Sequence, residues 1–170
     1  MMSEHLMTRL CRLFATAIIV GACILPSAAF ALTSREATAV VDIIERLQPT
    51  FGSFAYDEEI AEQWFERDSD EDRVITKAGF SEASWKTAVR DTVSGFMASL
   101  SDAELQGIFS GMKQGIEKLK HLNAAQKKEV LEAVDEQIQV VMAMRKEGQR
   151  FVNTVRPLVP RIRALMLDKR

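Results

Sequence analysis

Apolar residues recur at intervals of three or four along the chain after residue 32, and this period is the feature that most constrains the fold. One such run reads Val40, Ile43, Ile44, Leu47. The spacing places apolar side chains on one face of an α-helix, whereas a half-buried strand alternates at every second residue. No segment alternates convincingly in that way. The sequence therefore predicts an all-α fold with no sheet.

Capping signals divide this pattern into about six helices. In a capping box, a cap side chain and the side chain three positions later satisfy free backbone amides at a helix N-terminus. Boxes with this spacing begin at Thr33, Ser101 and Asn123, and Ser81 is placed to cap a further helix. We expect these helices to form a single-domain bundle over residues 32–170.

Proline and glycine mark the expected helix ends. Pro49 and Gly52 are expected to stop the first helix, because proline cannot donate to the helical ladder and glycine favours helix C-termini. Pro157 and Pro160 predict a break, or a fresh first turn, near Arg156.

The N-terminal segment has the features of a secretory signal. Arg9 and Arg12 precede an apolar run from Leu13 to Leu25, and the small residues that end at Ala31 give a cleavage site. We therefore predict a signal peptide over residues 1–31. Its removal during export across a bacterial inner membrane would leave a periplasmic or secreted protein.

Two alternatives concern the same segment. Residues 20–23 resemble a lipoprotein box, which would leave a lipidated Cys23, and the apolar run could instead remain as an uncleaved anchor. Ordinary cleavage is favoured, because the residues after Cys23 stay apolar through Leu32 and the run is short for a span of about 20 residues. Cleavage removes both cysteines, Cys11 and Cys23, so that no disulfide holds the mature fold.

Asp68, Asp70 and Asp72 occupy alternate positions in the most acidic stretch of the chain. The carbonyl group of Val74 and the hydroxyl group of Thr76, or its water, continue this spacing. Hard oxygen atoms at alternate positions of a loop are the ligands that calcium prefers. These five residues are therefore the candidate metal ligands, and calcium is the candidate cofactor.

With Asp68 at its first position, the stretch 57–90 resembles the helix, loop and helix of an EF-hand. Ile75 stands at the apolar eighth position. Arg73 replaces the glycine that turns the loop, and Gly79 replaces the glutamate that supplies two oxygens. The resemblance implies a weak calcium site, with a dissociation constant of about 10⁻⁴–10⁻³ M. The alternative is an acidic, solvated loop between two helices.

A second resemblance concerns Leu122 to Gln126, which is similar to the Leu-Thr-x-x-Gln motif of small periplasmic helical chaperones. Asn123 stands in place of the threonine, and Leu100 to Leu105 is a distant second copy. The resemblance implies a chaperone-like protein that binds protein partners without a metal site. Residues 148–151 with Pro157 also look similar to an uncharacterised family of secreted bacterial helical proteins, from which no activity carries over.

The inventory of reactive side chains argues against an enzyme. After residue 31 the chain has one histidine, His121, and no cysteine, which excludes cysteine–histidine catalysis and makes a zinc site implausible. The formal net charge of −2 gives no reason to expect nucleic acid as a partner. We expect no stable membrane span in the mature chain.

Two further groups of residues have expected places in the fold. The methionines after residue 31 fall mostly on apolar helix faces and are expected to fill the core; they are Met97, Met112, Met142, Met144 and Met166. The C-terminal segment is basic and amphipathic. We expect it to dock on the bundle, and the alternative is a helix that lies on anionic lipid.

The sequence thus leaves two functions open. The first is a secreted, non-enzymatic helical protein that binds calcium weakly through residues 68–76. The second is a periplasmic interaction or chaperone-like protein without a metal site.

Overall fold

The computed structural model describes residues 31–54 and 58–167, and over these ranges the chain forms helices and no strand. Residues from Ala31 onward form one compact unit. Of the predicted signal peptide over residues 1–31, all but Ala31 lie outside the described residues. The prediction of an all-α fold is confirmed. Six described helices have eight residues or more, namely α2 (Ser34–Phe51), α3 (Glu58–Asp70), α5 (Glu82–Ser99), α6 (Asp102–Glu117), α7 (Ala124–Gly148) and α9 (Val159–Met166).

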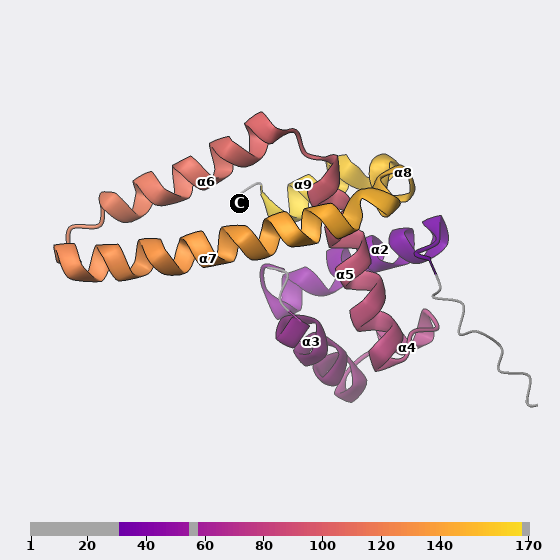
Figure 1. The fold of residues 1–170 in the computed structure, drawn as a ribbon. Coiled ribbons are helices and arrows are strands. Elements are labelled where there is room, and N and C mark those ends of the chain that lie inside the picture. The colour runs from indigo at the N-terminus through magenta and orange to yellow at the C-terminus, as the bar shows by residue number, and fades with distance from the viewer. Residues whose placement is uncertain (1–30, 55–57, 168–170) are drawn as a thin grey trace, which may run out of the picture. The chain divides into compact units, whose positions relative to one another are not determined.

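Helix α5 is the central element of this unit, and it packs against α2, α3 and α7 (Figure 1). Residues 91–96 of α5 are all buried. The side chain of Trp85 is also fully buried, and its indole N–H donates a hydrogen bond to the carbonyl oxygen of Ala61 in α3 at 2.9 Å. Phe80, just before the cap, packs edge-on against Trp85 with ring centroids 5.8 Å apart. This contact is a hydrophobic staple that fixes how the chain enters α5.

The three predicted capping boxes are confirmed at Thr33, Ser101 and Asn123. At the start of α6, the carboxylate of Glu104 accepts hydrogen bonds from the backbone N–H and the hydroxyl group of Ser101, each at 2.8 Å. Arg163 of α9 donates to the same carboxylate at 2.8 Å. These bonds, with that from the backbone N–H of Ser101 the largest cause, lower the pKa of Glu104 to about 2, so that the carboxylate stays ionised in acid that would protonate an ordinary glutamate.

Helix α2 corrects one prediction. It runs through Pro49 and ends only at Gly52, which has a left-handed φ of 94° and donates its N–H to the carbonyl oxygen of Gln48 at 2.9 Å. Pro49 lies in the last turn of α2, where the helix loses only the one hydrogen bond that proline cannot donate. The predicted stop at Gly52 is confirmed. Glycine suits this position because it adopts a positive φ without steric cost.

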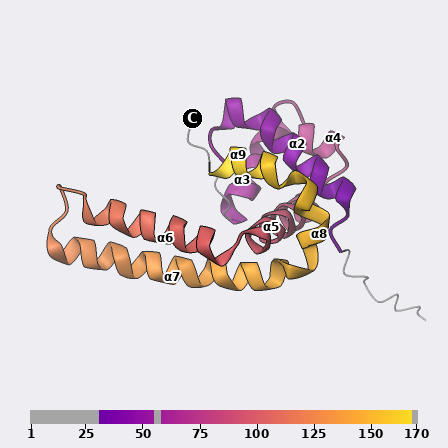
Figure 2. The same cartoon turned by 90° about the horizontal axis from the view of Figure 1, so that it is seen from above.

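Helices α6 and α7 form an antiparallel hairpin that extends beyond the other helices (Figures 1 and 2). Lys127 and Arg145 of α7 contact Glu117 and Asp102 of α6, and half-buried residues continue the same face of α7 between them; they are Leu131, Val134, Ile138 and Val141. Arg145 fixes the base of the hairpin. Its guanidinium group donates to the carbonyl oxygen of Leu100 at 3.0 Å and pairs with the carboxylate of Asp102 at 2.6 Å.

The C-terminal segment docks on the bundle, as expected. The chain turns through η1 (Gln149–Phe151), α8 (Val152–Val155) and η2 (Arg156–Leu158) before α9 packs against α2 and α5. The break at Arg156 agrees with the prediction from the two prolines. Arg161 of α9 pairs with Glu45 and Asp42 of α2, each at 2.6 Å, and these bonds raise its pKa.

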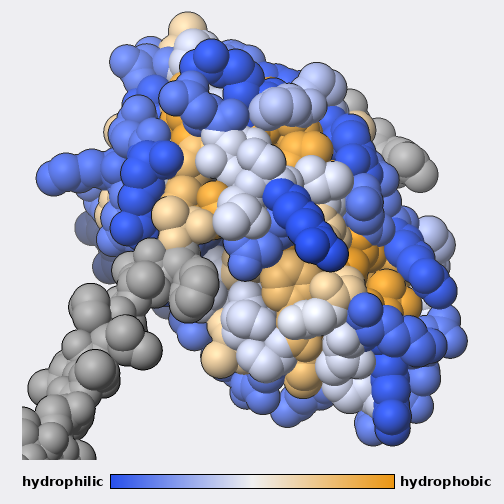
Figure 3. All heavy atoms as spheres, turned by 90° about the vertical axis from the view of Figure 1, so that its right-hand side faces the viewer, coloured by the Kyte–Doolittle hydropathy of each residue, from blue (hydrophilic) through white to orange (hydrophobic). Residues whose placement is uncertain are grey.

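The described surface differs between its two ends. On the face at the right-hand side of Figure 1, apolar side chains are separated by polar ones (Figure 3). All the large apolar side chains that are exposed among the described residues lie instead between Met112 and Met142, in the hairpin. Within the described residues, no helix is long and apolar enough to cross a membrane.

Two helices approach each other closely where α7 ends on α5. A Cβ atom at Gly148 would overlap the carbonyl group of Ser94 and lie 2.9 Å from the backbone nitrogen of Gly95. Gly95 is itself crowded, since a Cβ atom there would lie 2.8 Å from the Cγ2 of Val155. Glycine at position 148 therefore sets the distance between α5 and the base of the hairpin.

We predict that Gly148→Ala lowers the free energy of unfolding by about 2–3 kcal/mol, because backbone atoms of α5 must move to admit the methyl group. Gly111→Ala is the matched control. A Cβ atom there meets nothing within 4 Å, so this variant should gain up to about 1 kcal/mol from the better helix propensity of alanine. Urea denaturation followed by circular dichroism measures both, and equal effects would contradict the close contact.

Candidate functional site

The predicted calcium loop begins with a residue that has a structural role. Asp68 lies in the last turn of α3 and its side chain is fully buried. One carboxylate oxygen accepts a hydrogen bond from the backbone N–H of Val74 at 2.9 Å, and the other accepts one from the N–H of Ile75 at 2.8 Å. Asp68 therefore satisfies two amides at the start of the short helix α4 (Val74–Lys77).

The other predicted ligands are not gathered around Asp68. Asp70 and Asp72 are exposed, and α3 continues through Asp70. The hydroxyl group of Thr76 donates to the carbonyl oxygen of Arg73 at 3.2 Å. Within residues 31–54 and 58–167, no group of three or more acidic, histidine or cysteine side chains is placed to hold a metal ion. The structure thus brings together only Asp68 and the backbone of Val74, through a hydrogen bond.

The turn itself retains one feature of the EF-hand resemblance. Arg73, at the place of the expected glycine, adopts a left-handed conformation with φ 55° and ψ 39°. Its N–H donates to the carbonyl oxygen of Asp68 at 2.8 Å. A left-handed turn residue is uncommon for a side chain larger than asparagine, so the loop keeps the sharp turn without the residue type that favours it.

Asp68→Ala is expected to lower the free energy of unfolding by about 3 kcal/mol, because it leaves two buried backbone amides without an acceptor. Asp72→Ala, on the exposed side of the same loop, should change it by less than about 0.5 kcal/mol. Thermal and urea unfolding without added metal test this pair. Similar stabilities for the two variants would show that the bonds to Val74 and Ile75 contribute little.

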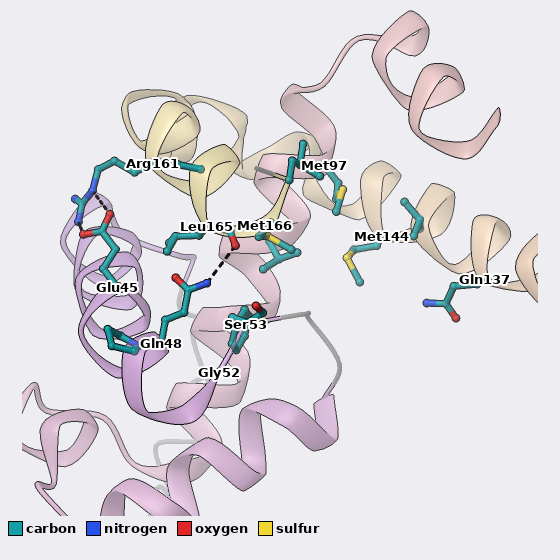
Figure 4. Close-up of a pocket in the computed structure, with 16 residues that line it drawn as sticks. Glu45, Gln48, Gly52, Ser53, Met97, Gln137, Met144, Arg161, Leu165 and Met166 are labelled. Carbon is teal, nitrogen blue, oxygen red and sulfur yellow. Dashed lines mark hydrogen bonds and ion pairs between the residues drawn. The ribbon is translucent and has the colours of Figure 1, made fainter. Parts of the chain in front are cut away.

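A groove with a volume of about 1090 Å³ lies elsewhere, where the end of α2 meets α5, α7 and α9. Met97 of α5, Met144 of α7 and Met166 of α9 converge on it (Figure 4). Each of these side chains is half-buried against the core and keeps part of its surface open. Gln137 lies farther along the α7 wall.

The groove is lined by apolar and amide side chains without a free charge. Its two charged lining residues, Glu45 and Arg161, bind each other at 2.6 Å (Figure 4). The amide of Gln48 donates a long hydrogen bond, 3.5 Å, to the carbonyl oxygen of Leu165. Gln137 is exposed at the rim. Amide groups both donate and accept hydrogen bonds, so they suit the backbone of a peptide better than an ion.

The sequence did not predict this groove. Three of the five methionines, Met97, Met144 and Met166, pack against the core as expected. None of the five is fully buried, and Met112 and Met142 are 48% and 41% exposed, so the expectation of core filling is wrong for these two. Both lie on the hairpin, where two helices alone cannot cover the apolar side chains of either one. The spacing of apolar residues along a helix shows that they lie on the same face. It does not show whether another helix covers that face.

Comparisons with known proteins give no assignment. No family model matches the chain, and neither the curated proteins nor the solved structures include a match. The function is therefore argued from the geometry and chemistry of the site.

Proposed function

We propose that this chain is a non-catalytic binding protein that holds an apolar segment of another protein in the groove between α2, α5, α7 and α9. The observation that carries the proposal is the convergence of Met97, Met144 and Met166 on a groove that contains no unpaired charge. Methionine is flexible and polarisable, so it fits apolar side chains of varied shape. Such a surface suits a protein that accepts more than one partner.

The size of the groove favours a peptide over a metabolite. Its volume of about 1090 Å³ is slightly above the range of roughly 300–1,000 Å³ that is typical of small-molecule sites. The paired Glu45 and Arg161 leave no free charge for a phosphate or carboxylate. His121, the histidine of the predicted mature chain, is exposed in the turn between α6 and α7 and does not line the groove.

The predicted export implies where this binding would take place. A protein whose signal peptide spans residues 1–31 would act in the periplasm or outside the cell, where a chaperone-like protein meets unfolded chains. This placement rests on the sequence of the first 31 residues and forms part of the proposal.

The proposal predicts that the mature chain suppresses the aggregation of chemically reduced insulin without any metal. Met144→Gln should weaken this suppression several-fold, because it places an amide in the apolar part of the groove. Met142→Gln is the matched control, since Met142 is on the same helix but does not line the groove. Light scattering in the presence of a chelator measures the effect.

Either of two results would count against the groove. One is an equal loss in the two methionine variants, which would point to a general effect of a polar residue on α7. The other is a failure of the unmodified chain to slow aggregation even at stoichiometric excess.

Weak calcium binding is the second candidate function. The left-handed turn at Arg73 and the solvent-accessible carboxylates of Asp70 and Asp72 favour it. It ranks below the groove because both oxygens of Asp68 already accept backbone hydrogen bonds. A cation would have to compete with the amides of Val74 and Ile75 for them.

Calorimetric titration of calcium into the mature chain, with magnesium as the control, tests this candidate. Weak saturable binding that Asp70→Ala abolishes would establish the loop as a calcium site. The groove proposal predicts no saturable heat and no effect of calcium on the suppression of aggregation.

A further inference from the structure

A second stripe, mostly exposed, runs along α7 beside the face that meets α6. Its members are spaced alternately by four and three residues, as in the seam of a coiled coil. They are Gln126, Val130, Ala133, Gln137, Val140 and Met144, and we call them the outer stripe. Val140 is 53% exposed and Val130 is 37% exposed, yet no member of the outer stripe is charged. An uncharged heptad seam on an exposed helix indicates a surface that another helix covers.

The outer stripe is continuous with the groove. Gln137 and Met144 belong to both, and Figure 4 shows them on the same stretch of α7. From the groove the stripe leads outward to Gln126, a distance of about 27 Å at 1.5 Å per residue. A bound segment that starts in the groove therefore has a path along α7 of about five helical turns.

Helix α6 leaves room beside this path. Gly111 and Gly115 are exposed, and a Cβ atom at either position would meet nothing within 4 Å. Met112, between them, is 48% exposed. On α6, a third helix that contacted both α6 and α7 would thus meet two glycines and one methionine, none of which is charged.

The outer end of the stripe is basic. Lys118 and Lys120 are exposed in the turn that joins α6 to α7, next to the exposed His121. Lys127 and Lys128 follow in the first turns of α7, where Lys127 donates to the carbonyl oxygen of Glu117 and Lys128 pairs with Glu132 at 3.7 Å. The groove end has no such excess, because Arg161 is already paired. The uncharged path therefore ends near two exposed cations, Lys118 and Lys120.

We infer that the partner segment is an amphipathic α-helix that lies along the outer stripe, with its apolar seam on Val130, Val140 and Met144 and an acidic end against Lys118 and Lys120. The inference rests on the proposed function and specifies the conformation and charge of the segment that the groove holds. Apolar contact supplies the binding, and the cations set the direction in which the helix lies.

A second copy of this chain fits the stripe less well. Glu129 and Glu136 are exposed and lie next to the outer stripe on the side away from α6. In an antiparallel pair of α7 helices, Glu129 of one copy would face Glu136 of the other, and like charges opposite each other are destabilising. The stripe is therefore better suited to a different chain.

Two fluorescent peptides of about 21 residues test the inference. Both carry leucine at heptad positions on one face; one has a cluster of glutamates at one end, and the other has lysines there. Fluorescence anisotropy at low salt should show that the acidic peptide binds the mature chain about tenfold more tightly. Lys118→Glu with Lys120→Glu should reverse this preference, whereas Lys146→Glu, an exposed lysine on α7 outside the stripe, should leave it unchanged.

Val140→Glu should weaken the binding of both peptides by about tenfold or more. Because Val140 is 53% exposed, the variant is expected to fold, and circular dichroism verifies this. Equal affinity for the two peptides, or no effect of Val140→Glu, would overturn the inference. So would light scattering that shows a dimer which Val140→Glu converts to a monomer, because a second copy would then cover the stripe.

The test separates this inference from the proposed function. If suppression of aggregation depends on Met144 but neither peptide is preferred, the groove binds apolar segments and the helical, acidic partner is wrong. If Met144→Gln has no effect on suppression, the groove itself fails, and the peptide result then reports only on α7.

Discussion

Gly148 of α7 lies directly against the backbone of α5 at Ser94, and this contact sets how closely the hairpin joins the other helices. Because no side chain of Gly148 separates the two helices, α7 ends directly on the most buried part of α5. The same crossing brings Met97 and Met144 to one groove. The hairpin, the groove and the outer stripe therefore share one fixed point.

Much of the fold follows from local chemistry that the sequence displays. The capping boxes at Thr33, Ser101 and Asn123 depend on residues three positions apart, and Phe80 meets Trp85 through a similarly short separation. Proline usually ends a helix, so the sequence predicts a stop at Pro49. In the last turn of α2, however, Pro49 costs the helix only one hydrogen bond, and the helix continues to Phe51. Helix boundaries of this kind depend on what surrounds the final turn.

The proposed binding surface is much harder to predict from the sequence. The groove combines Gln48, Met97, Met144 and Leu165, which lie on four helices and whose meeting depends on the fold. Asp68 shows a different difficulty, which is that one sequence pattern has two explanations. Carboxylates at alternate positions suit a calcium loop, and they also suit a turn that needs an acceptor for backbone amides. Asp68 is buried, and its two hydrogen bonds to backbone amides give it a part in the fold whether or not the loop binds a cation. Alternate spacing in the sequence does not reveal this part.

Methionine methyl NMR shows whether a peptide binds in the groove, because the five methionines after residue 31 report on separate parts of the surface. With selectively labelled mature chain, the acidic amphipathic peptide should shift the methyl signals of Met97, Met144 and Met166 and leave that of Met142 in place. This result would place the peptide in the groove. Shifts confined to Met142, or no shift at the three groove methionines at a saturating peptide concentration, would show that the peptide does not bind in the groove.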